Sequence, residues 1–201
     1  QLYDGKIKKL REKTQGQLII KEYPTASAHS GHFKSLINEL ALKKSFRPDV
    51  IFIDYLNICA SSRFKGGNIS SYFYVKAIAE ELRGLAVEFN VPIFSATQTT
   101  RTGFVSTDIG LEDTSESFGL PATADFMFAL ISNEELEALG QMKIKQLKNR
   151  YNDPSVNRAF IVGVDRSKMR LYDVQQSSQN IVDSNQVDEK EDAYNKFSDF
   201  K

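Results

Sequence analysis

The sequence has little cysteine and no excess of charge of either sign. Cys59 is the one cysteine among 201 residues, so no disulfide framework can form within the chain, and a reducing compartment is compatible with it. Lysine and arginine together number 26, as do aspartate and glutamate, which excludes a strongly basic coat for nucleic acid. Any contact with nucleic acid must therefore be local and made by a few loops.

Other familiar signals are also missing from the sequence. No apolar run approaches the roughly 20 residues that span a bilayer, and no signal peptide is visible. The phosphate-binding pattern G-x-x-x-x-G-K-[ST] does not occur, because Gly5-Lys6-Ile7 has neither the preceding glycine nor the hydroxyl residue. The chain opens at Gln1 within a helical pattern, which indicates a fragment or a trimmed chain.

Apolar periodicity predicts one α/β domain over residues 1–174. Helices are expected over 3–13, 31–44 and 70–89. The apolar stripe of the second helix consists of Phe33, Leu36, Ile37, Leu40 and Ala41. The expected strands are 17–21, 49–55, 93–97, 125–131, 142–147, 159–164 and 169–174, with a hairpin across 165–168.

Strands that alternate with helices predict a mostly parallel sheet flanked by helices. The apolar run 49–55 is typical of a central strand covered on both faces. The polar segment 99–117 is too long for an ordinary connection, so we expect it to be functional or mobile. Residues 175–201 are polar and acidic with few large apolar groups, which predicts a disordered tail that solubilises the protein or binds a partner.

Polar side chains follow three of the predicted strands. Asp54 ends an apolar run, and a carboxylate there can hold a Mg²⁺ shell beside nucleotide phosphates. Gln98 follows the next strand and can contact a γ-phosphate. Lys148 and Arg150 lie on one side of an extended segment and can clamp the charge on a transferring phosphoryl group. Taken alone, Asp54 also fits an ordinary strand end, and Gln98 fits an amide that caps a strand. The Lys148–Arg150 segment also fits a solvated basic turn.

The order of these segments resembles the successive motifs of DnaB-type replicative helicases, and among them the T4-type phage helicases. The resemblance is carried by DVIFIDYLNIC, VKAIAEELRGLAVEFNVPIFSATQTTR, DTSESFGLPATADFMFAL and MKIKQLKNRYND, and it covers nearly all of residues 1–174. It implies a RecA-like P-loop NTPase core that is truncated at its N-terminus and lacks the Walker A loop. It also implies an ATP-dependent helicase that unwinds DNA 5′ to 3′ during replication.

By this resemblance, Asp54 would be the Walker B carboxylate that orders the Mg²⁺ shell of bound ATP, and Gln98 would be the γ-phosphate sensor. Arg150 would be an arginine finger that reaches the ATP of the neighbouring subunit, with Lys148 assisting. The family's ring is a hexamer around single-stranded DNA. Primase and a helicase loader are further implied partners, and no membrane contact is implied. The implied location is the cytoplasm of an infected bacterial host.

Three loops would then face the DNA, over residues 63–69, 99–108 and 113–120. Their candidate DNA contacts are Arg63, Lys65, Arg101, Thr102, Ser115, Glu116, Phe118 and Gly119. The third loop departs from the family pattern, because Ser115 stands at a family arginine and Phe118 at a family glycine, and an ordinary surface loop is its alternative. The family's catalytic glutamate has no convincing match in the chain.

Two other interpretations stay open. The chain could be a non-hydrolysing RecA-like interaction subunit that donates Arg150 to an intact motor, or a fragment of a RecA-like recombinase. The isolated chain is expected neither to hydrolyse ATP nor to unwind DNA, because it lacks the lysine and the N–H groups of the phosphate loop. His29 and His32 have no further ligands nearby in the sequence, so we expect them to serve a loop and a helix start.

Overall fold

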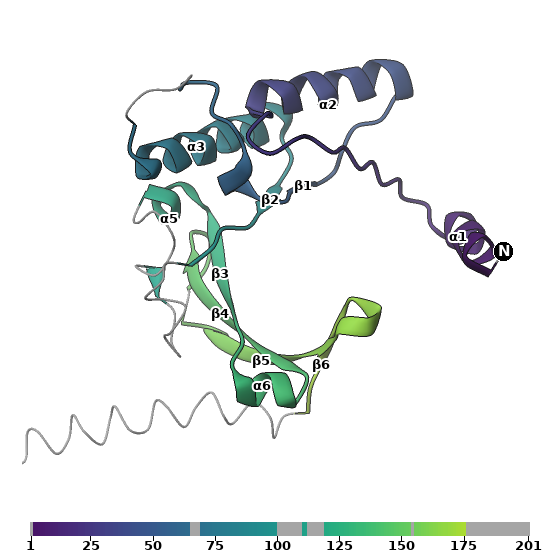
Figure 1. Ribbon diagram of the computed structural model, residues 1–201, viewed down its shortest axis with the longest axis vertical. Helices are drawn as coiled ribbons and strands as arrows, with labels where there is room; N and C mark the ends of the chain where they lie inside the picture. The colour runs from purple at the N-terminus through teal and green to yellow at the C-terminus, as the bar shows by residue number, and fades with distance from the viewer. Residues whose placement is uncertain (1, 65–68, 100–109, 112–118, 154, 176–201) are drawn as a thin grey trace, which may run out of the picture.

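Two sheets and the helices packed beside them make up the structure, a computed structural model that describes residues 2–64, 69–99, 110–111, 119–153 and 155–175. Helix α1 (Leu2–Lys13) stands apart from the rest at the end of an extended segment (Figure 1). Residues 176–201 of the predicted tail and most of the long polar segment lie outside the described residues. None of the described helices has the length and apolar character needed to cross a membrane.

Helix α2 (Ser30–Lys44) begins at a pair of histidines that cap it. The Gly31 amide donates to Nδ1 of His29 at 3.0 Å, and the His29 amide donates to Nδ1 of His32 at 3.2 Å. The expectation that these imidazoles serve a helix start is thereby confirmed. The predicted apolar stripe is also confirmed, since Ile37 is buried and forms its centre.

A parallel pair of short strands is joined through a long helix. Strands β1 (Ile51–Ile53) and β2 (Ile93–Ser95) pair in register along all three residues. The connection passes through the turn η1 (Leu56–Ile58) and helix α3 (Ser71–Phe89). Asn90 ends α3 in a left-handed conformation with φ of 52°, which closes the last turn and redirects the chain into β2. This is the predicted βαβ unit.

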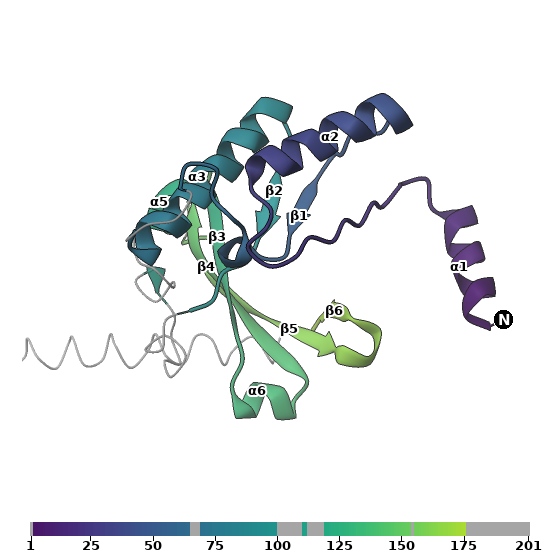
Figure 2. The same cartoon turned by 45° about the horizontal axis from the view of Figure 1, so that its top comes forward.

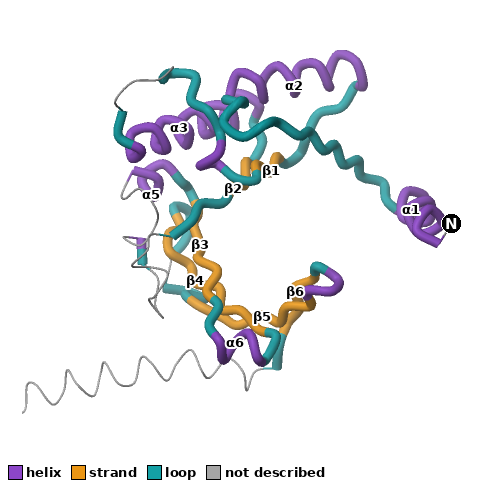
Figure 3. Tube along the Cα trace, in the orientation of Figure 1, coloured by secondary structure: helices purple, strands orange, loops and turns teal. Residues whose placement is uncertain are grey.

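A four-stranded antiparallel sheet follows and curves away from the parallel pair (Figures 2 and 3). Its strands in spatial order are β3 (Phe126–Ile131), β4 (Gln141–Asn149), β5 (Ala159–Asp165) and β6 (Arg170–Asp173). Helix α5 (Gly119–Thr123) precedes β3, and α6 (Glu134–Ala138) joins β3 to β4. The predicted β5–β6 hairpin is confirmed, with the turn η3 (Arg166–Lys168) between its strands.

The main core connects the two parts of the chain that carry candidate site residues. Its buried members are Leu56, Cys59, Val75, Ile78, Ala79, Leu82 and Leu120. Ile53 of β1 and Met127 of β3 pack against the same cluster. Burial raises the pKa of the Cys59 thiol, so this cysteine is a packing residue. The core therefore ties β1, α5 and β3 to helix α3.

Three expectations about strands are wrong. The larger sheet is antiparallel, so β1 and β2 are the one parallel pair in the described part of the chain, and the sheet is not mostly parallel. Residues 17–21 form no strand, and Leu18 and Ile20 are 82% and 83% exposed. Phe52 in β1 is 71% exposed, so this strand is not covered on both faces. An apolar segment becomes a buried strand only where a partner strand pairs with it and other elements cover it.

Candidate functional site

The carboxyl ends of β1 and β2 bring two of the predicted site residues together. Asp54 directly follows β1 and is exposed, and Gln98 follows β2 by three residues. The Ser95 hydroxyl donates to the Ile53 carbonyl at 2.8 Å, and Nε2 of Gln98 donates to the Tyr55 hydroxyl at 3.3 Å. Gln98 thus contacts the residue next to Asp54. This edge of a parallel sheet is where such folds bind ligands.

Asp54 offers a single carboxylate to a cation at this edge. In the part of the chain that the structure describes, no group of three or more His, Cys, Asp or Glu side chains could hold a metal ion. Mg²⁺ in nucleotide sites is held by one or two carboxylates together with phosphate oxygens and waters. Asp54, an exposed carboxylate at the end of β1, is of the residue type that such a magnesium shell uses.

Lys148 and Arg150, at the end of β4, both reach the same short helix. Lys148 Nζ donates to the Pro121 carbonyl at 2.6 Å, and Arg150 donates to the Ala122 carbonyl at 3.3 Å. Both cations therefore contact the carboxyl end of α5. Burial and the nearby Arg150 guanidinium lower the pKa of Lys148, and the Asp125 carboxylate partly opposes them.

Asp125, between α5 and β3, joins two arginines. Its Oδ1 lies 2.6 Å from Nη1 of Arg83 and 3.2 Å from Nη1 of Arg150. The Arg150 amide also donates to the Asp125 carbonyl at 2.9 Å. Hydrogen bonding and charge from Asp125 raise the pKa of Arg83. With Lys148, three cations gather around this carboxylate, and the excess of positive charge suits an anionic ligand.

The predicted DNA-contacting residues are only partly within the described structure. Arg63 is half-exposed and forms an ion pair with Glu80 of α3. Gly119 is buried at the start of α5, where an added Cβ would come within 3.0 Å of the Tyr72 ring. Its role as a DNA contact stays a prediction. Lys65, Arg101, Thr102, Ser115, Glu116 and Phe118 lie outside the described residues.

Glu81 of α3 fixes the base of the first predicted DNA-facing loop. Its carboxylate accepts hydrogen bonds from the hydroxyls of Ser30, Ser61 and Ser62 at 2.8, 2.6 and 2.8 Å, and from the Ser62 amide at 3.0 Å. Burial acts to raise the pKa of Glu81, but the bonds from Ser61, Ser62 and Ser30 outweigh it and lower the pKa to about 2. The carboxylate joins α3, the start of α2 and the chain ahead of Arg63.

Replacing Glu81 with glutamine is expected to lower the free energy of unfolding by about 2 kcal/mol, because charge-assisted hydrogen bonds are lost. Glu80→Gln is the matched control on the same helix. It removes a solvent-accessible ion pair with Arg63 and should cost less than about 1 kcal/mol. Urea unfolding of the full chain at neutral pH measures both variants, and equal losses would contradict the role of Glu81.

The stabilisation by Glu81 should depend on pH in a defined direction. Its pKa in the folded chain is about 2, below the ordinary value of 4.5, so the carboxylate stabilises the fold above pH 4.5. That contribution is lost as the pH falls from 4.5 toward 2. The difference in unfolding free energy between wild type and Glu81→Gln should therefore shrink over this range.

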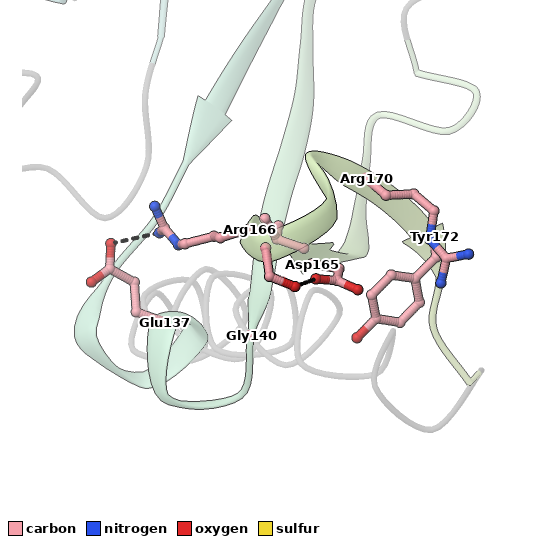
Figure 4. Close-up of a pocket in the computed structure, with 8 residues that line it drawn as sticks. Glu137, Gly140, Asp165, Arg166, Arg170 and Tyr172 are labelled. Atoms are coloured by element: carbon pink, nitrogen blue, oxygen red, sulfur yellow. Dashed lines mark hydrogen bonds and ion pairs between the residues drawn. The ribbon is translucent and has the colours of Figure 1, made fainter. Parts of the chain in front are cut away.

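A shallow hollow beside the β5–β6 hairpin holds charges that already pair with one another (Figure 4). Arg166 lies 3.5 Å from Glu137, and Asp165 accepts from the Ser167 hydroxyl at 2.6 Å. The Tyr172 ring lies where a Cβ on Gly163 would be. These internal pairs make the hollow a solvated surface feature of the hairpin.

Arg83, Asp125 and Glu81 were not identified from the sequence. Each lies far along the chain from its partners, and no local spacing connects them. The one available signal was that Asp125 ends the segment DTSESFGLPATAD and opens the predicted strand 125–131. Their roles follow from the packing of α3 against α5 and the loop before residue 63.

No family model matches the chain. Over 177 residues, however, the chain is 48% identical to the DnaB-like replicative helicase of Enterobacteria phage T4. The chain is a homologue of part of this helicase. The match covers 88% of the chain and 37% of the T4 helicase, so the chain spans little more than a third of the curated relative it matches.

Solved structures share the fold of this DnaB-like chain at lower identity. One is an ATPase domain, with a TM-score of 0.62 and 18% identity over 74% of this chain and 52% of that one. Another is a DnaB-like replicative helicase described together with its interactions with primase, with a TM-score of 0.62 and 17% identity over 74% of this chain and 35% of that one. The mixed α/β fold is therefore that of DnaB-like ATPase domains.

Proposed function

We propose that these residues form part of the motor of an ATP-driven replicative helicase that moves along single-stranded DNA as a hexameric ring and unwinds duplex DNA 5′ to 3′. The identity of 48% with the T4 phage helicase over 88% of the chain carries this proposal. The grouping of Asp54 with Gln98, and of Lys148 with Arg150, supports it.

The β1–β2 edge is proposed to face the nucleotide. Bound Mg²⁺–ATP supplies the phosphoanhydride bond whose hydrolysis drives the motor. Asp54 would order the waters of the Mg²⁺ shell, and the Gln98 amide would contact the γ-phosphate. Because Gln98 directly precedes the second predicted DNA-facing loop, loss of its phosphate contact would release that loop.

The cations at the end of β4 are proposed to face the nucleotide of the neighbouring subunit. The Arg150 side chain is 43% exposed, and two of its guanidinium nitrogens contact Asp125 and Ala122. A guanidinium has five N–H donors, so others remain for a phosphate. Arg150 would stabilise the negative charge of the transition state, with Lys148 beside it.

Two exposed aromatic side chains on β1 and β2 support the proposal that a further part of the motor packs against these strands. Phe52 and Phe94 stack with ring centroids 5.3 Å apart and are 71% and 48% exposed. Contiguous exposed apolar groups of this kind mark contact surfaces. The chain matches 52% of the similar solved ATPase domain. We assign the phosphate-binding loop to the remaining part of such a domain, packed over these rings.

Two assays test the proposal. The isolated chain should show no ATP hydrolysis with single-stranded DNA, because it lacks the phosphate-binding loop. A T4 chimera, defined as the T4 phage helicase with its matching segment replaced by this chain, should hydrolyse ATP in response to single-stranded DNA and unwind a fork with a 5′ tail. Robust turnover by the isolated chain would refute the first expectation. A folded T4 chimera without DNA-stimulated turnover would refute the proposed function.

A further inference from the structure

Helix α5 connects the third predicted DNA-facing loop with the predicted finger. It starts at Gly119, directly after residues 113–118 of that loop. Its last three carbonyls each accept a hydrogen bond from a different cation: Lys148 at 2.6 Å, Arg150 at 3.3 Å and Arg83 at 2.9 Å. Terminal helix carbonyls have no partners within the helix, so these donors satisfy groups that would otherwise need water.

Asp125 links two of these cations, Arg83 and Arg150, to each other. One carboxylate oxygen contacts both Arg83 and Arg150, and the Asp125 carbonyl accepts from the Arg150 amide. The finger therefore keeps a fixed position relative to the end of α5. Arg83 extends from α3, whose Leu82 is buried in the main core. The core therefore anchors the linked side chains of Arg83, Asp125 and Arg150.

The start of α5 is held as closely as its end. Gly119 lies against the Tyr72 ring, where a Cβ would approach to 3.0 Å, and Leu120 belongs to the main core. A short helix packed in this way moves as one piece, because displacement of its first residue displaces its carboxyl end.

We propose that Asp125 is a positioning residue for the finger: it holds Arg150 against the carboxyl end of α5, the helix that begins where the third predicted DNA-facing loop ends. The inference rests on the proposed helicase function and assigns to it a residue that touches neither DNA nor nucleotide. Arg83 keeps the Asp125 carboxylate oriented toward Arg150. Without the carboxylate, Arg150 keeps its charge and its bond to the Ala122 carbonyl but loses its ion pair, so its guanidinium is held less firmly against α5.

The test is Asp125→Asn in the T4 chimera, which keeps the size of the side chain and removes its charge. The ratio of the DNA-stimulated to the unstimulated rate of ATP hydrolysis should fall about tenfold, while the affinity for DNA stays within about twofold. Asp125→Glu should restore part of the stimulation. Asp153→Asn is the matched control, because this exposed carboxylate accepts from the Ser155 amide in the turn that follows β4.

Each outcome is decisive. An unchanged stimulation ratio in Asp125→Asn would overturn the inference, as would an equal fall of the stimulated and unstimulated rates, which indicates a structural role. If Asp125→Asn does not fold, Arg83→Gln provides the measurement, and it must also lower the stimulation ratio. An unmutated T4 chimera that DNA does not stimulate would refute the proposed function itself, and the coupling with it.

Discussion

Replacing Arg150 with alanine in the T4 chimera is expected to lower the DNA-stimulated kcat about 1000-fold or more while nucleotide affinity stays within about threefold. The reason is that a finger stabilises charge that develops only in the transition state, whereas ground-state binding depends on other groups. Steady-state ATPase measurements give kcat, and titration with a fluorescent ATP analogue gives Kd.

Two variants control this experiment. Arg166→Ala removes an exposed arginine of the β5–β6 turn that pairs with Glu137, and it should leave kcat unchanged. Arg150→Lys keeps the charge but loses the planar fork, so it should recover only part of the activity. A loss of affinity as large as the loss of kcat, or an unchanged kcat, would contradict the role of Arg150. Thermal unfolding of each variant shows whether the fold is intact.

Asp54→Asn in the T4 chimera is expected to lower DNA-stimulated turnover about 100-fold, because the amide no longer orders the water shell of the metal as the carboxylate does. The concentration of Mg²⁺ needed for half-maximal turnover should rise in the same variant. Asp54 is exposed, so the unfolding temperature should stay the same. A Mg²⁺ titration of ATPase activity measures both effects.

Asp49→Asn is the matched control for Asp54. Asp49 lies just before β1 and is also exposed, so it stands at the opposite end of the same strand. Its replacement should alter neither turnover nor the Mg²⁺ requirement. An Asp54→Asn variant that needs no more Mg²⁺ than wild type would show that this carboxylate does not act on the metal.

Helices were predictable from the sequence because their apolar stripes are local signals. The stripe of α2 and the span of α3 both follow from a period of 3.6 residues. Most strand positions were predictable for the same reason, as were the β1–β2 unit and the β5–β6 hairpin, but the antiparallel pairing of β3 with β4 and of β4 with β5 was not. The antiparallel order of β3 to β6 is set by contacts between segments, and period-2 alternation is the same in parallel and antiparallel sheets.

The prediction for residues 17–21 failed for a related reason. Leu18 to Ile20 form a short apolar run that fits a buried strand, yet Leu18 and Ile20 are exposed and pair with no described strand. Periodicity reports which face could be buried, and burial itself needs a partner surface. The same holds for Phe52, whose strand was expected to be covered on both faces.

The candidate site was predictable where it depends on strand ends. Asp54 and Gln98 were placed together because parallel strands end at the same edge, and the Gln98–Tyr55 hydrogen bond agrees with this. Asp125 and Glu81 were missed, because their partners come from other elements that only the folded chain brings near. Their roles, like those of the strand-end residues, are now open to experiment.

Mixing two inactive T4 chimeras tests most directly whether one subunit's arginine completes its neighbour's magnesium–nucleotide site. One carries Asp54→Asn and the other Arg150→Ala. In mixed rings at equal amounts, about one quarter of the interfaces would join an intact Asp54 to an intact Arg150 from the adjacent subunit, and ATP hydrolysis should return. Mixed rings that form but remain as inactive as either variant alone would show that Arg150 does not act across the subunit boundary.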